Sequence, residues 1–261
     1  MKATIGQEAY HWSSVSEAAR RAISVRYSLL TYMYTLFYYA HTQGETVMRA
    51  LAWEFPNDAS LRAVDTQFLL GPSILVTPVL EPNVDTVRGV FPGIGAGTRW
   101  YDWYTLAEVQ AQPQQNVTLS APLEVINVHV RGGSILPLQQ PKYTTGETRN
   151  TPYSLLVALD DNAEATGSLY LDDGVSLQPN ATRLVQVIAL FQALLRCKKS
   201  ANDHFSSPTP TTACPSHQRA TTTLHNRWPM SPSPALRIHP TVIMVASVVV
   251  LVVATTASLK A

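Results

Sequence analysis

The stretch VHVRGGSILPLQQP, Val128 to Pro141, combines a histidine, an arginine and a glycine pair within a few residues. It could be a general base beside an anion-binding glycine loop, or a strand that runs into a turn. Val128 and Val130 alternate with His129 and Arg131, which is the period of a β-strand. The alternation predicts a strand whose histidine points away from the local apolar face. The glycine pair then supplies the positive φ of a turn.

Similar short apolar runs recur on both sides of this stretch, separated by glycine, proline and aspartate turn signals. Residues 67–80, QFLLGPSILVTPVL, hold two such runs divided by Gly71-Pro72. The other predicted strands are Thr86–Phe91, Thr98–Tyr104, Val117–Leu119, Val125–Val130, Ser154–Leu159 and Ser168–Leu171. Regularly spaced short strands of this kind are typical of antiparallel β-sandwich domains.

Ahead of the strands, apolar residues recur at helical spacing with no glycine or proline between Ser14 and Gly44. Ser14 and Glu17 have the spacing of a capping box, and Gly44 is a suitable C-terminal stop. One long helix is therefore predicted. Its tyrosines occur on more than one face, which indicates a helix packed inside a larger protein.

The composition changes near residue 187. Residues 1–187 carry 12 Lys+Arg and 17 Asp+Glu, whereas residues 188–261 carry 7 Lys+Arg and a single acidic residue, Asp203. All 12 glycines lie at or before Gly174. Residues 183–199 are predicted to form a helix, and the Ser/Thr/Pro-rich residues 200–240 are predicted to form no packed core. The apolar segment 241–259 is a marginal length for a membrane span, and suits either a tail anchor or a C-terminal signal for a lipid anchor that follows a polar spacer.

Few residues indicate chemistry. The overall net charge of +1 gives no case for a nucleic-acid partner. Asp160-Asp161 and Asp172-Asp173 lie in turn-like contexts and form no evident catalytic dyad. No catalytic residue, metal site or cofactor is predicted. Asn116 and Asn180 begin Asn-x-Thr patterns and are the predicted N-glycosylation sites.

Five aromatic residues could stack on sugars, although the interpretation as core and surface aromatics is favoured. They are Trp53, Trp100, Tyr101, Trp103 and Tyr104.

Several blocks together resemble glycoside hydrolase family 31, whose members include α-glucosidases and maltases. The first is RYSLLTYMYTLFYYAHTQGETVMRALAWEFPND, residues 26–58. The others are QFLLGPSILVTPVLEP (67–82), FPG (91–93), WYDWYT (100–105), APLEVINVHVRGGSILPLQQP (121–141) and LVALDDNAEATGSLYLDDGVSLQPN (156–180). The blocks follow the family's order over residues 6–187.

The resemblance implies an α+β chain in which the helical end of a catalytic (β/α)8 barrel precedes β-sandwich domains. The implied units are 1–64 as the last helical part of the barrel, 65–144 as a proximal β-sandwich, 145–187 as the start of a distal β-domain, 188–240 as a divergent linker, and 241–259 as a hydrophobic segment. A whole barrel takes about 200 residues or more, so it cannot fit before residue 65. In the family, the nucleophile and acid/base aspartates lie upstream of the segment that this chain resembles. No residue of this chain is therefore assigned either role.

Three functions are therefore weighed. The first is the C-terminal part of a retaining α-glucosidase, acting on α-linked glucosides and inactive without the missing N-terminal part of the same enzyme. The second is a non-catalytic carbohydrate-binding or structural β-module. The third is an accessory protein in contact with a membrane through residues 241–259. The resemblance implies the secretory pathway or the cell exterior.

Overall fold

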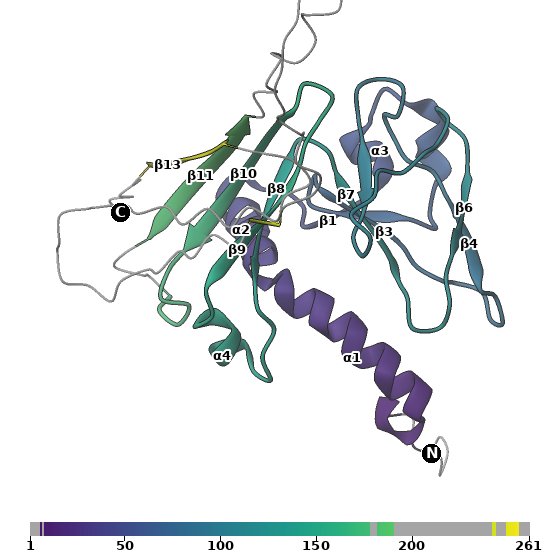
Figure 1. Ribbon diagram of the computed structural model, residues 1–261, viewed down its shortest axis with the longest axis horizontal. Coiled ribbons are helices and arrows are strands. Elements are labelled where there is room, and N and C mark those ends of the chain that lie inside the picture. The colour runs from purple at the N-terminus through teal and green to yellow at the C-terminus, as the bar shows by residue number, and fades with distance from the viewer. Residues whose placement is uncertain (1–5, 7, 178–181, 191–241, 244–248, 256–261) are drawn as a thin grey trace, which may run out of the picture.

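The computed structural model describes residues 6, 8–177, 182–190, 242–243 and 249–255, in which two main β-sheets lie beside a helical N-terminal region (Figure 1). The first sheet has the order β1-β2-β3-β7-β5 and is antiparallel. Its strands are β1 (Met48–Arg49), β2 (Phe68–Leu70), β3 (Ile74–Thr77), β7 (Asn127–Arg131) and β5 (Trp100–Asp102). A separate two-stranded ribbon pairs β4 (Thr86–Gly89) with β6 (Val117–Ser120).

The second sheet has the order β12-β9-β8-β10-β11-β13. Its strands are β12 (Val242–Ile243), β9 (Tyr153–Ala158), β8 (Ser134–Gln139), β10 (Glu164–Leu171), β11 (Arg183–Leu190) and β13 (Val249–Thr255). β8 pairs antiparallel with β9 and parallel with β10, which both follow the predicted boundary at 144/145. That division of the chain into domains stays a prediction.

The stretch Val128–Pro141 forms the strand and turn that its alternation and glycine pair predict, and a second strand, β8, follows without having been predicted. β7 belongs to the first sheet and β8 to the second, so the Gly132-Gly133 turn carries the chain from one sheet to the other. Gly133 has φ +85°, which only glycine adopts without strain. A Cβ at Gly132 would lie 2.7 Å from the carbonyl oxygen of Leu159. The turn therefore needs glycine at both positions, for different reasons.

The predicted single helix is two helices. α1 (Ser13–Ser28) and α2 (Leu30–Gln43) meet at Leu29, which is buried and ends the first helix. A short 3-10 helix, η1 (Ala9–His11), precedes them. The predicted capping box is also wrong: α1 begins at Ser13 after Trp12 with no side-chain cap, and Glu17 instead pairs with Arg21 at 2.7 Å. Gly44 ends α2 in the left-handed conformation, as expected.

Three short helices complete the described elements. They are α3 (Leu51–Glu54), the 3-10 helix η2 (Ala59–Ala63) and α4 (Thr145–Arg149). The capping box absent from α1 occurs at α4, where Thr144 and Glu147 each bond the other's backbone amide.

Residues 183–190 of the predicted helix 183–199 form strand β11 instead. β11 pairs with β10 along its whole length, from Arg183 opposite Leu171 to Leu190 opposite Glu164. Periodicity alone does not distinguish a buried strand from a helix in a short apolar run. Here the edge of β10 supplies backbone hydrogen-bond partners, which favour the strand. Residues 191–199, and the predicted linker from 191 to 240, lie outside the described residues.

Two strands belong to the predicted hydrophobic segment 241–259. β12 pairs with β9 at one edge of the second sheet and β13 with β11 at the other. The rest of the segment is not among the residues that the structure describes. In the described part of the chain, no helix is long and apolar enough to cross a membrane.

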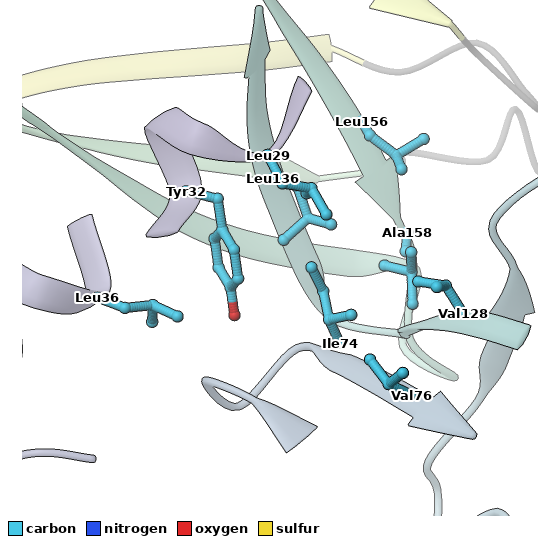
Figure 2. Close-up of a cluster of buried hydrophobic side chains, with 10 residues drawn as sticks. Leu29, Tyr32, Leu36, Ile74, Val76, Val128, Leu136, Leu156 and Ala158 are labelled. Carbon is cyan, nitrogen blue, oxygen red and sulfur yellow. The ribbon is translucent and has the colours of Figure 1, made fainter. Parts of the chain in front are cut away.

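The main core lies between α2 and the two sheets (Figure 2). Tyr32 and Leu36 of α2 meet Ile74 and Val128 of the first sheet and Leu136 of the second. A second core covers the other face of the first sheet, so that sheet is buried on both sides. The second core consists of Leu51, Leu61, Leu69, Leu75, Phe91 and Trp100.

Candidate functional site

The aspartate pairs 160–161 and 172–173 shape turns, as their sequence context predicts. Asp160 accepts the backbone amides of Asn162 and Glu164 at 2.8 and 2.9 Å. Asp173 accepts those of Val175 and Ser176. Asp161 instead accepts from Arg99, and Asp172 accepts from the Tyr34 hydroxyl and the Gly174 amide. That neither pair is a catalytic dyad stays a prediction.

His129 is 2% exposed, so the polar face of β7 does not meet solvent. Its side chain points away from Val128 and Val130, as predicted, but into the second core. There its ring meets Phe91 edge to face, with centroids 4.7 Å apart. Among the described residues its Nδ1 has no hydrogen-bond partner, and its Nε2 lies 4.0 Å from the Asp102 carboxylate. Burial lowers the pKa of His129 to about 4 against a weaker opposing effect of Asp102.

This histidine should make the protein less stable in mild acid. The folded-state pKa is lowered from 6.5 to about 4, so on acidification the unfolded chain takes up this proton first. Stability is then lost as the pH falls from about 6.5 toward 4, by about 2 kcal/mol between pH 7 and pH 5. Urea unfolding at both pH values measures the loss. His129→Phe should remove that part of the pH dependence, and an unchanged pH dependence in this variant would contradict the assignment.

A cluster of two arginines and two glutamates joins β1, α3 and β7. The Arg49 guanidinium, with a side chain 7% exposed, lies 2.5 Å from Glu45 and also bonds Glu54. Burial opposes the charge of Arg49, but the hydrogen bonds that it donates to Glu54 and Glu45 outweigh this effect and raise the pKa of the guanidinium. Arg131 lies 3.7 Å from Glu54 and stacks over Phe55 at 4.6 Å. This cluster was not predicted, because nothing in the sequence of residues 45–54 marks which charges are buried.

The aromatic residues considered for sugar stacking are mostly structural. Trp100 is fully buried and donates its indole N–H to the carbonyl of Pro92 at 2.9 Å. Tyr101 is half-buried and donates to the carbonyl of Leu159, and Trp103 packs against the main core. Trp53 and Tyr104 are exposed, on separate elements. The preferred interpretation as core and surface aromatics agrees with this placement.

α1 packs on the main core only near its C-terminal end, through Val25, and the rest of the helix extends away from the two sheets (Figure 1). None of its residues is buried. Its apolar side chains nevertheless gather on one side, and Val15 and Ile23 are 37% and 52% exposed. Trp12 and Tyr10, just before the helix, are 50% and 73% exposed. A helix with this pattern normally buries its apolar side against another element.

Of the two predicted glycosylation sites, Asn116 lies exposed just before β6, and Asn180 is outside the described residues. Among the described residues, no cluster of three or more His, Cys, Asp or Glu side chains could hold a metal ion.

Comparison with known proteins places this architecture. Residues 44–136 match the glycosyl hydrolase family 31 C-terminal domain. The chain is 61% identical over 186 residues to an α-glucosidase of Aspergillus niger, a match that covers 71% of this chain and 19% of that enzyme. It is 60% identical over 178 residues to an α-glucosidase of Schizosaccharomyces pombe, covering 68% and 18%. The chain belongs to glycosyl hydrolase family 31.

A solved family 31 structure supports the fold. A family 31 dextranase of Flavobacterium johnsoniae aligns with a TM-score of 0.66 and 27% identity, over 72% of this chain and 23% of the dextranase. This chain thus spans about a fifth of the length of the curated relatives it matches.

The family 31 match begins at Gly44 and ends within β8. It includes the arginine–glutamate cluster, His129 and Trp100, so these belong to the part that the family model describes. α1, α2 and most of the second sheet lie outside the residues that the family model matches.

Proposed function

We propose that this chain acts as the C-terminal part of a retaining α-glucosidase and completes a catalytic barrel supplied by the missing N-terminal part. The supporting observation is α1, a helix with an exposed apolar side at the N-terminal end of a family 31 domain. By resemblance, α1 and α2 are the helical end of the barrel. The second sheet then supports the barrel through α2, which packs on its strands β8 and β10.

The purified chain alone should not hydrolyse α-glucosides. Retaining hydrolysis needs two carboxyl groups about 5–5.5 Å apart on either side of the scissile bond. In this chain Asp160 and Asp173 bond turn amides, and Asp161 bonds Arg99. The assay is release of p-nitrophenol from p-nitrophenyl α-glucoside, with the intact Aspergillus niger α-glucosidase as the positive control. Turnover by the 261-residue chain above a heat-denatured sample would refute this proposal.

We further propose that the chain enters the secretory pathway and is glycosylated at Asn116. Its side chain is exposed at the start of an edge ribbon, where an acceptor can be reached. Expression in a secreting yeast should add one N-glycan there, seen as a mass decrease after treatment with endoglycosidase. Asn116→Gln should abolish that glycan, whereas an unchanged mass pattern in the variant would reject Asn116 as the acceptor.

The non-catalytic module and the membrane-bound protein are the alternatives. Membrane contact through residues 241–259 is favoured by the apolar run from Val242 to Ala254. Strands β12 and β13 of this run instead pair with strands β9 and β11 of the second sheet. Carbonate extraction of expressing cells separates the two, because release of all the protein into the soluble fraction would count against an integral anchor.

A further inference from the structure

A cavity of about 450 Å³ lies where α2 meets the turn between the two sheets and strand β10. α2 contributes Tyr32, Thr35 and Tyr39 to its wall. The Gly132-Gly133 turn and Ser134 form a second side, and β10 forms a third with residues 166–168. The cavity is within the size range of small-molecule sites, about 300–1,000 Å³. Three elements from distant parts of the chain therefore converge on it.

Arg131 is the charged donor of this cavity. Its only partners among the described residues are Glu54, at 3.7 Å, and the ring of Phe55. The distance to Glu54 is too long for a hydrogen bond. A guanidinium has five N–H donors. Because its side chain is 28% exposed and borders the cavity, Arg131 keeps donors for a ligand.

The other polar groups of the cavity add one negative charge and several hydroxyl groups to the positive charge of Arg131. Glu45 borders the cavity with a side chain 42% exposed, so one carboxylate acceptor accompanies the one guanidinium. Hydroxyl groups of Ser134, Thr166 and Ser168 add groups that both donate and accept. The wall carries no excess charge, and it mixes hydroxyls with tyrosine rings. A neutral ligand with several hydroxyl groups on a partly apolar ring matches this lining.

We propose that the cavity is a binding site for a hexose. The proposal concerns ligand binding alone, and the site is built wholly from described residues of this chain. Its existence does not depend on the proposed α-glucosidase role. Sugar binding by the isolated chain tests the cavity, whereas activity with a barrel tests the proposed function.

Thr166 offers a substitution that fills the cavity without disturbing the core. Its side chain is exposed at the cavity, and its backbone amide is held by the carbonyl of Gly133 at 2.9 Å. A phenylalanine at this position would occupy ligand space. Thr86 is an equally exposed strand threonine on β4, outside the cavity. Thr86→Phe is therefore the matched control.

The experiment is saturation-transfer NMR of the full chain with glucose, titrated to give the affinity, and with inorganic phosphate as competitor. We expect glucose binding that Thr166→Phe weakens about tenfold or more and Thr86→Phe leaves unchanged. Arg131→Gln should also weaken it, which covers the case in which Thr166→Phe does not fold by circular dichroism. Three results would overturn the proposal: no glucose binding to the wild-type chain, equal affinity in the cavity variants and Thr86→Phe, or displacement of glucose by phosphate.

Discussion

Replacing Arg49 with methionine should lower the free energy of unfolding by about 3–5 kcal/mol. The side chain is 7% exposed and pairs with both Glu45 and Glu54. The Glu54 side chain is only 14% exposed, and its other cationic neighbour, Arg131, is 3.7 Å away. Loss of Arg49 therefore leaves a nearly buried carboxylate without its close partner. Removing one member of a buried ion pair is costly for that reason.

Urea unfolding of the full chain measures this effect. Arg88→Met is the matched control, because Arg88 is exposed on the ribbon strand β4 and its loss should change stability by no more than about 0.5 kcal/mol. Equal unfolding midpoints for the two variants would show that the cluster contributes nothing to stability. The cluster joins the segment after α2 to β7, so its loss should also loosen the attachment of the helices.

Replacing Trp100 with alanine should lower the free energy of unfolding by about 3–5 kcal/mol. The indole is fully buried in the second core, and its removal leaves both a cavity and the carbonyl of Pro92 without its donor. Trp53→Ala removes the same group from a site that is 63% exposed, where a change within about 0.5 kcal/mol is expected.

The same pair of variants distinguishes core packing from sugar stacking. If Trp100 stacked on a sugar, Trp100→Ala would lose carbohydrate retardation in affinity electrophoresis on starch while keeping its unfolding midpoint. A lowered midpoint is the result that the buried position predicts.

Much of the β-structure could be predicted from the sequence because turn residues separate its strands. The runs ending at Pro92-Gly93 and Gly132-Gly133 each became strands at their expected places. The helix break at Leu29 left no such signal, since no glycine or proline marks it and tertiary packing in the main core places that residue. The strand at 183–190 was missed for a similar reason: its local pattern suits a helix, and only pairing with β10 makes it a strand.

The burial of polar residues was harder still to predict. Alternation placed His129 opposite Val128 and Val130, but could not show that a second core covers that face. Arg49, Glu54 and Arg131 are likewise brought together by chain segments about 80 residues apart, so no local motif announces their cluster. The cavity beside Arg131 depends on three such segments at once.

The central claim, that this chain completes a catalytic barrel, is tested most directly by co-expression with the Aspergillus niger α-glucosidase truncated where its match to this chain begins. The co-purified pair should hydrolyse p-nitrophenyl α-glucoside while each part alone does not. Ile23→Glu, on the exposed apolar side of α1, should reduce the pair's activity about tenfold or more, because it places a charge in the contact. Ser24→Glu, the exposed neighbour on another side of the helix, should leave it unchanged. Equal activity in the two variants, or an inactive pair that nevertheless co-purifies, would contradict the claim.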